Sequence, residues 1–330
     1  MKKILGAVSN ISTLPEEIQV DIFIKVPMKY IGISRCVCKL WRNLLHSSKF
    51  IGYHLNYTNA NKNNQKLMCL TKDHYSLHSI EYASVSSLSP MPSFNKAGKW
   101  IIEICGSCNG LVCLRIYGCD EKCNGKYCIC IWNPLTREYK EMSDSFGTSL
   151  CFKFRCGFGY DCNFYTYKLV RIAIIYETGT LEIRVKTLAS DSWTHIRPAL
   201  TYSFPDCYVH TCGLIFNGAL HWLGTNTTQE TSFEVIMSFN ISTERFEDIR
   251  LPEHTLAHPN GKEWCTSLAV LGDNLCLFNV DPDSLVEMWV MLEYGVRESW
   301  TKQLSITHQV KALTSGLWIF TGPRISACKG

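Results

Sequence analysis

The sequence predicts an α+β multidomain protein, in which a small unit of three short helices precedes a larger all-β repeat domain. Apolar residues recur at helical spacing between residues 14 and 45, among proline and cap signals. Further along the chain, an aromatic residue that closes a polar phrase returns at nearly equal intervals. Short β-type runs bounded by asparagine and glycine turns fill those intervals. Two kinds of periodicity in one chain indicate two kinds of domain.

The composition favours a folded protein and gives no support for binding to nucleic acid or insertion into a membrane. Of 330 residues, 46% are hydrophobic and 19% are charged, which is near the globular average. The net charge is +4, and the first 50 residues carry eight Lys and Arg against three Asp and Glu, so the remaining residues sum to −1. A phosphate-tracking surface needs clustered positive charge, which the large region lacks. No run of about 18 apolar residues occurs, so no membrane span is expected.

The cysteines indicate a reducing compartment. Eighteen cysteines make up about 5% of the chain, below the density of a secreted disulfide scaffold. The apolar run at residues 4–8 is too short for a signal peptide. We therefore expect a cytoplasmic protein, in the cytosol or alternatively the nucleus, whose cysteines are mostly small buried hydrophobes.

The first predicted helix starts at a capping box and carries one apolar stripe. Thr13 is the expected N-cap and Glu16 folds back onto it. Pro15 is tolerated in the first turn, because the amide that it lacks would be unpaired there. The stripe runs for about three turns and is stopped by a proline; its members and that proline are Leu14, Ile18, Ile22, Phe23, Val26 and Pro27.

Two further short helices complete the predicted unit. One covers residues 28–35, and the next begins near Cys38 with Trp41 and Leu44 on one side. A unit of roughly 40 residues is marginal as an independent fold. Apolar surface that it cannot bury internally is surface offered to a partner. The alternative is that residues 14–45 form only a helical cap on the large domain.

These residues resemble a plant F-box. The matching strings are LPEE at 14–17, VPMK at 26–29 and RCVCKLW at 35–41. In that family the helices dock onto a Skp-type adaptor, which links to a cullin ubiquitin ligase. The resemblance implies these adaptor-binding residues: Leu14, Pro15, Glu16, Ile18, Ile22, Phe23, Val26, Pro27, Cys36, Val37, Lys39, Trp41 and Leu44.

The larger region has a period near 50 residues. Its closing aromatics are Tyr139, Trp193, Phe246 and Trp300, at intervals of 54, 53 and 54 residues. Asparagine-glycine turns, as at 109–110 and 217–218, each precede another apolar run. Several strands and hairpin turns per repeat indicate a kelch-type β-propeller, in which the closing aromatic packs between adjacent blades. The alternative is an irregular β-sandwich with coincidental spacing.

The same region resembles the F-box-associated region of plant F-box proteins. The strings are CNGLV at 108–112, WNPLTR at 132–137 and FGYD at 158–161. Residues 288–300 are similar to the S-locus F-box proteins of pollen, which are implied to bind pistil S-RNases and deliver them for ubiquitination. The expected organisation is an N-terminal tail (1–13), an F-box (14–55), a linker or surface loop (56–66), a β-propeller-like domain (67–306) and a divergent tail (307–330). That tail does not complete another repeat, so we expect an incomplete, less stable propeller.

The predicted function is that of a non-catalytic substrate receptor of an SCF-type ubiquitin ligase. Its partners would be the adaptor and a protein substrate, with S-RNase as the named candidate. Candidate substrate loops are residues 118–126, 161–167, 226–233 and 254–262. We expect no cofactor, and no metal at the cysteines of residues 105–130, because histidine is absent there. The alternatives are a carbohydrate-binding module, a copper oxidase, and a non-functional truncated S-locus paralogue.

Overall fold

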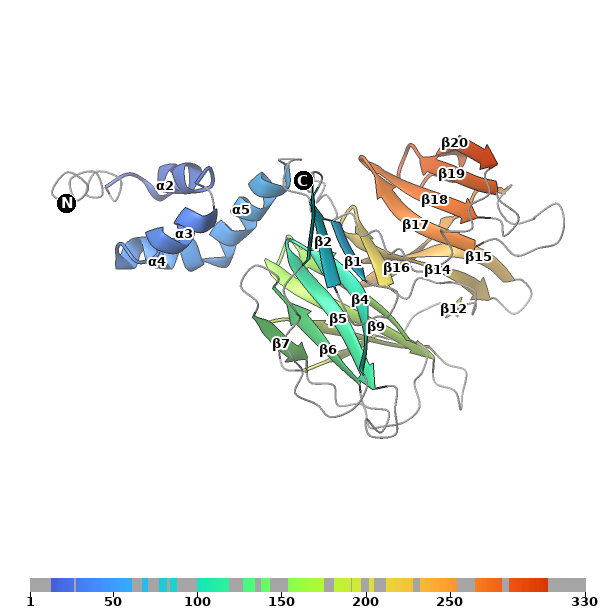
Figure 1. The fold of residues 1–330 in the computed structure, drawn as a ribbon, viewed down its shortest axis with the longest axis horizontal. Helices are drawn as coiled ribbons and strands as arrows, with labels where there is room; N and C mark the ends of the chain where they lie inside the picture. The colour runs from blue at the N-terminus through green and yellow to red at the C-terminus, as the bar shows by residue number, and fades with distance from the viewer. Residues whose placement is uncertain are drawn as a thin grey trace.

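A helical N-terminal unit leads into a mostly β domain in the computed structural model (Figure 1). The residues described are 13–26, 28–60, 67–70, 77–81, 84–87, 100–118, 127–133, 138–142, 154–174, 181–190, 192–196, 202–204, 212–227, 232–253, 265–280 and 285–307. None of the helices within these ranges is long and apolar enough to cross a membrane. The predicted order, a small helical unit and then a large β domain, is confirmed.

Four helices form the N-terminal unit: α2 (Glu16–Phe23), α3 (Met28–Ser34), α4 (Lys39–His46) and α5 (Ser48–Ala60). Their shared core consists of Phe23, Ile31, Trp41, Leu45 and Phe50. The first three helices lie where the sequence predicted them, except that α2 ends at Phe23 and does not continue to Pro27. The fourth helix was not predicted, and it continues through the first five residues of the expected linker. The packed residues of α5 are Phe50, His54 and Leu55, all before this stretch, so residues 56–60 extend a helix that is held by its earlier turns.

The start of α2 differs from the predicted capping box. Pro15 (φ −51°, ψ 148°) occupies the N-cap position and contributes no side-chain hydrogen bond to the helix. The helix therefore begins two residues later than predicted, with Glu16 as its first residue instead of its third. Gln19 stabilises this end instead, because its Nε2 donates a 2.8 Å hydrogen bond to the carbonyl of Leu14. At α4, the Sγ of Cys38 caps the helix by accepting from the amide of Trp41 at 3.5 Å.

The β domain contains, among the described residues, four antiparallel four-stranded meanders, which we call blades 1 to 4. A three-stranded sheet precedes them, and the second and third blades join through parallel pairing of β8 with β13. The three-stranded sheet consists of β1 (Leu67–Leu70), β2 (Leu77–Glu81) and β3 (Ser84–Ser87).

The blades follow in chain order. Blade 1 contains β4 (Trp100–Cys108), β5 (Leu111–Gly118), β6 (Tyr127–Trp132) and β7 (Tyr139–Met142). Blade 2 contains β8 (Phe154–Asp161), β9 (Thr166–Ile174), β10 (Leu181–Thr187) and β11 (Thr194–Ile196). Blade 3 contains β13 (Cys212–Phe216), β14 (Ala219–Thr227), β15 (Ser232–Asn240) and β16 (Arg245–Arg250), and the short strand β12 (Tyr202–Ser203) pairs with β14. Blade 4 contains β17 (Cys265–Leu271), β18 (Asn274–Val280), β19 (Leu285–Met291), the 3-10 turn η4 (Arg297–Ser299) and β20 (Trp300–Thr307).

The hydrophobic core lies between consecutive blades. One cluster joins blades 1 and 2, a second joins blades 2 and 3, and a third joins blades 3 and 4. The closing aromatics Trp193, Phe246 and Trp300 contact these three clusters in order, each toward the preceding blade. The predicted packing between blades is confirmed for these three. It is wrong for Tyr139, which is 44% exposed because none of the four described blades precedes its own.

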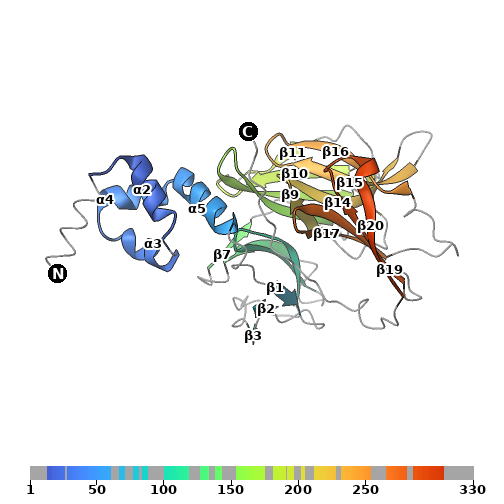
Figure 2. The same ribbon diagram turned by 90° about the horizontal axis from the view of Figure 1, so that it is seen from above.

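Alternating short turns and longer connections give the β domain two distinct rims. Asn109 and Gly110, and likewise Asn217 and Gly218, have positive φ angles between 47° and 80°. Two consecutive positive φ angles define the type I′ hairpin, so the predicted asparagine-glycine turns are confirmed. We call the end with these short turns the near rim, and the opposite end of the strands the far rim. In Figure 2 α5 leads from the other helices to the β domain.

Candidate docking surface

An exposed aliphatic stripe follows one side of α2. Leu14, Ile18 and Ile22 recur every fourth residue, and their exposed fractions lie between 36% and 45%. The opposite side of the same helix faces inward through Gln19 and Phe23, both of which are buried. Large aliphatic side chains at this spacing, left uncovered by the helical unit, form a surface suited to another protein.

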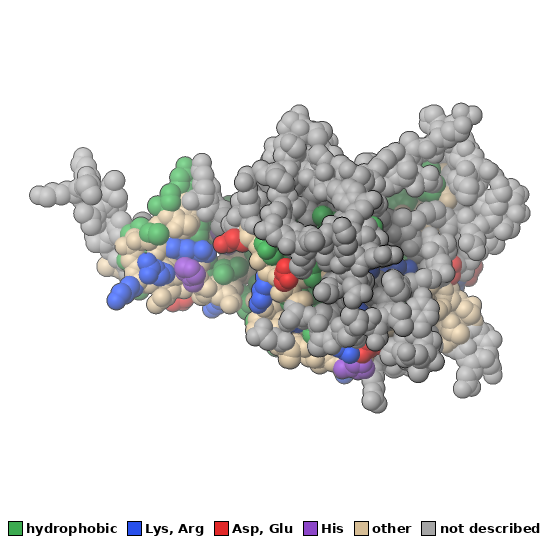
Figure 3. Space-filling view, turned by 60° about the horizontal axis from the view of Figure 1, so that its bottom comes forward, with side chains coloured by type: hydrophobic (Ala, Val, Ile, Leu, Met, Phe, Trp, Pro, Cys, Tyr) green, Lys and Arg blue, Asp and Glu red, His purple; other side chains and the backbone are tan. Residues whose placement is uncertain are grey.

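Three more exposed aliphatic residues continue from α3 into α4. Ile33, Val37 and Leu40 are exposed, Ile33 most of all at 64%. The sequence prediction included Val37 but missed the other two. Ile33 lies in α3, Val37 in the turn and Leu40 in α4, so no single helical period links them and their spacing could not have identified them. We refer to Leu14, Ile18, Ile22, Ile33, Val37 and Leu40 together as the exposed aliphatic set. On this unit, Figure 3 shows hydrophobic side chains next to Lys and Arg side chains.

Two of the predicted adaptor-binding residues lie inside the helical unit. Phe23 and Trp41 are buried and stack edge to face, with ring centroids 4.8 Å apart. Val26 and Leu44 are half-buried against the same core. These four side chains stabilise the unit that carries the surface rather than forming its exposed part. The predicted residues that are exposed are Leu14, Pro15, Glu16, Ile18, Ile22, Cys36, Val37 and Lys39, and Pro27 lies outside the described residues.

A groove between α2 and α4 adds polar character beside the exposed aliphatic set. It has a volume of about 330 Å³ and is lined by Glu16, Gln19, Leu40, Asn43, Leu44 and Ser47. The buried Gln19 lies in this lining, and its Oε1 has no hydrogen-bond partner. An unpaired buried carbonyl oxygen costs about 1–3 kcal/mol. A partner that supplied a donor there would recover part of that free energy.

The predicted substrate loops do not share one rim. The turn within residues 161–167 lies on the near rim, where Asp161 is buried and Tyr165 touches α5 at Gly52. Phe164 in the same turn is 67% exposed, so the substrate loop expected here remains a prediction. Of the other three predicted loops, residues 119–126, 228–231 and 254–262 lie outside the described residues, while Asn226 and Thr227 end β14 and Asn226 is buried.

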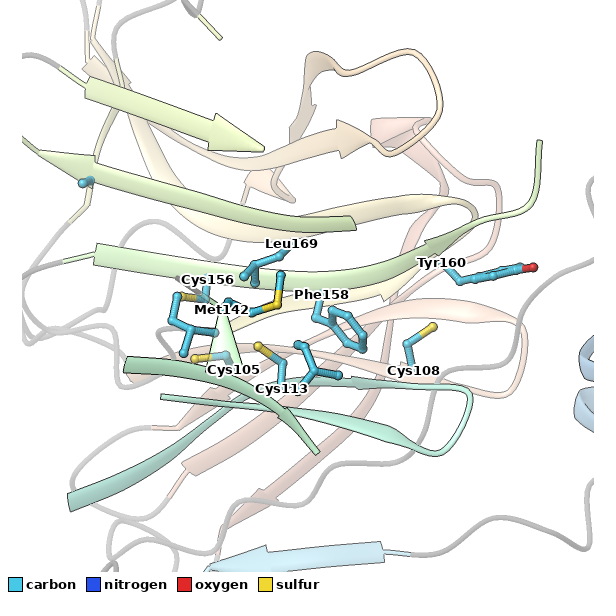
Figure 4. Close-up of a cluster of buried hydrophobic side chains, with 11 residues drawn as sticks. Cys105, Cys108, Cys113, Met142, Cys156, Phe158, Tyr160 and Leu169 are labelled. Carbon is cyan, nitrogen blue, oxygen red and sulfur yellow. The ribbon is translucent and has the colours of Figure 1, made fainter. Parts of the chain in front are cut away.

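Cysteines of blades 1 and 2 contribute to the apolar packing between these blades. Cys105, Cys113 and Cys156 are buried together in the cluster between these blades (Figure 4). Burial raises the pKa of Cys113 and Cys156, and burial raises the pKa of Cys108 nearby to about 12. Within the described ranges, no three His, Cys, Asp or Glu residues are arranged to hold a metal ion, and Cys119 and Cys123 lie outside those ranges.

Known families and proteins match both parts of this architecture. The family described as the F-box associated beta propeller domain matches residues 65–321, and the F-box domain family matches residues 11–51. The F-box protein CPR1 of Arabidopsis thaliana is 28% identical over 316 residues, covering 89% of this chain and 73% of that protein. An F-box/kelch-repeat protein of the same species is 25% identical, covering 94% of this chain and 83% of that protein. Among solved structures, the GH74 xyloglucanase from Xanthomonas campestris matches at 12% identity with a TM-score of 0.37, over 74% of this chain and 44% of that one.

Proposed function

Because the chain belongs to the F-box proteins that carry an F-box associated β-propeller domain, we propose that it is a substrate receptor of an SCF-type cullin ubiquitin ligase. Its helical unit binds a Skp-type adaptor, and its β domain binds a protein substrate. These family matches confirm the predicted F-box and F-box-associated region. The chain contributes binding surfaces, and its partners perform the transfer of ubiquitin. We place it in the cytosol or the nucleus, because its described cysteines are free thiols.

The observation that carries this proposal is the exposed stripe of α2. Leu14, Ile18 and Ile22 are exposed although the same unit buries Phe23 and Trp41 efficiently. Covering a large aliphatic side chain is worth about 1.5–3 kcal/mol. Three of them on one helix therefore provide enough free energy to anchor a partner, with polar groups at the α2–α4 groove adding specificity.

The test replaces Ile18 and Ile22 together by Asp. Both side chains are exposed, so the thermal unfolding of the chain should change little. Losing two apolar contacts of this kind predicts at least a roughly hundredfold weaker affinity for a purified Skp-type adaptor. The measurement is titration calorimetry, with Leu14→Ala plus Pro15→Ala as a milder second variant.

The matched control is Ile51→Asp, which places the same charge at an exposed isoleucine of α5. Its adaptor affinity should equal that of the unmodified chain. If the double Asp variant binds the adaptor as tightly as the control does, α2 is not the docking helix and the assignment fails.

The substrate is the finer part of the proposal. We propose a pistil S-RNase, on the ground that residues 288–300 are similar to the S-locus F-box proteins of pollen. These residues include the end of β19, the turn η4 and the start of β20. Retention of purified non-self S-RNases on the adaptor-bound chain tests this choice. Failure to retain any of them would leave the receptor class intact and remove S-RNase as its substrate.

A further inference from the structure

Helix α5 contributes to two hydrophobic cores from opposite sides. Phe50 belongs to the core of the helical unit, and His54 is buried one turn later with its ring 5.9 Å from that of Phe50. Gly52 and Leu55 lie on the other side of the helix. Leu55 packs against the cluster between blades 1 and 2. A single helix of 13 residues, about 20 Å long, thus joins the two parts of the molecule.

The absence of a side chain at Gly52 permits this contact. A Cβ atom built there would lie 2.6 Å from Cδ1 of Tyr165 and 3.4 Å from the hydroxyl oxygen of Tyr160. Contacts under 3.0 Å do not occur for real Cβ atoms, so any other residue would displace the Tyr165 ring or the helix. Glycine costs roughly 1 kcal/mol relative to alanine inside a helix. Close approach of the β domain accounts for its presence here.

Tyr165 occupies a backbone conformation that is unusual for its residue type. Its φ angle is +52°, in the left-handed region where glycine and asparagine are common and bulky residues are rare. Holding a tyrosine there costs on the order of 1–3 kcal/mol. The contact of its ring with Gly52 gives the side chain a role that glycine could not fill.

Buried polar bonds hold the Tyr165 turn from beneath. One carboxylate oxygen of Asp161 accepts hydrogen bonds from the amides of Asn163 and Phe164 and from the hydroxyl of Ser242. The other forms a 3.1 Å ion pair with Lys168, whose Nζ also donates 2.8 Å hydrogen bonds to the Ile241 carbonyl and to Glu244. Because Ser242, Ile241 and Glu244 belong to blade 3, two blades fix the turn that meets α5. A turn fixed by these bonds presents a rigid contact surface to α5.

We propose that the contact between Gly52 and Tyr165 positions the helical unit relative to the β domain, so that a substrate on the β domain is held at a fixed orientation to the adaptor. These are positioning residues: neither belongs to the exposed aliphatic set. Only the consequence for the substrate rests on the proposed receptor function. The fixed orientation of the helical unit relative to the β domain does not depend on binding to a ligase.

The test uses the full chain with two variants that act on the same contact. Tyr165→Gly removes the ring and suits the positive φ angle, so the turn should remain folded. Gly52→Leu improves helix propensity and introduces the clash. For both, we expect roughly tenfold faster amide hydrogen exchange at residues 52–57, the result of losing about 1.4 kcal/mol of local stability. Small-angle X-ray scattering should show a broader distance distribution, while adaptor affinity remains unchanged.

Neighbouring positions supply the controls. Phe164→Ala removes the adjacent aromatic, which is 67% exposed, and Tyr53→Leu places leucine on the exposed side of α5; both should match the unmodified chain in exchange and scattering. Unchanged exchange and scattering in Tyr165→Gly and Gly52→Leu would overturn the proposal. Loss of adaptor binding by these two variants would also overturn it, because the contact would then support the docking surface itself. If the unmodified chain binds no adaptor, the receptor function fails, and the exchange and scattering results still decide the positioning role.

Discussion

At the scale of single residues, His221 shows how burial sets a protonation state. It lies at the boundary of blades 3 and 4, where its Nε2 is 2.8 Å from the hydroxyl of Tyr294 and its Nδ1 is 3.2 Å from the carbonyl of Leu214. Burial lowers its pKa from the ordinary value of 6.5 to about 4. The imidazole is therefore neutral in the folded protein at neutral pH and forms a structural bridge between the blades.

This lowered pKa predicts a specific loss of stability in mild acid. Between pH 6.5 and 4 the unfolded chain binds a proton at His221 that the folded chain does not, so stability falls as the pH falls through this window. The full effect of this residue is about 3 kcal/mol. Urea unfolding at a series of pH values should show that slope, and His221→Gln should flatten it while lowering stability at neutral pH. An unchanged slope in His221→Gln would contradict the assignment.

At the scale of elements, equivalent aromatic residues in different blades show how much packing between blades contributes. Trp300 and Tyr139 are equivalent positions, yet Trp300 is 7% exposed and Tyr139 is 44% exposed. The Nε1 of Trp300 also donates a 3.0 Å hydrogen bond to the carbonyl of Arg250 in the preceding blade. Trp300→Ala should therefore lower the free energy of unfolding by about 3–5 kcal/mol. Tyr139→Ala should cost less than about 1 kcal/mol, and equal losses in thermal or urea unfolding would contradict this account.

Local sequence patterns predicted those elements whose cause is local. Asn109-Gly110 and Asn217-Gly218 specify their own turns, and the spacing of Leu14, Ile18 and Ile22 specifies one side of a helix. The predicted capping box was wrong because Pro15 takes a non-helical conformation that the neighbouring sequence does not indicate. The prediction of a linker from residue 56 was wrong because α5 is held by Phe50 and Leu55, which contact residues distant in sequence.

The candidate site was predictable in composition but not in orientation. An apolar residue in a short helix can face either a partner or the core of its own unit, and periodicity alone does not distinguish the two. Trp41 was expected to be an interface anchor, but α5 supplies Phe50 to complete a core around it. Ile33 was missed because its exposure follows from the packing angle of α3. Such facts depend on tertiary packing, so only the structure reveals them.

At the scale of the whole molecule, the two rims of the β domain have different neighbours. The near rim contacts α5 through Tyr165, so it belongs to the side that holds the adaptor. The far rim is formed by the opposite ends of the same strands, as at Gly118 in β5 and Thr227 in β14. Connections on a rigid scaffold are where recognition commonly resides. Under the proposed function, the substrate should therefore be bound at the far rim.

This division predicts which segments select the captured protein. Residues 119–126 and 228–231 can be replaced by glycine-serine segments of equal length. Proteins that co-purify with the unmodified, adaptor-bound chain and are identified by mass spectrometry should then no longer co-purify. Adaptor affinity should remain unchanged, because α2 is untouched. The matched control changes the near rim conservatively: Asn109→Asp preserves the type I′ turn before Gly110 and should leave the captured set intact. Retention of the same proteins after both far-rim replacements would contradict the assignment of substrate binding to the far rim.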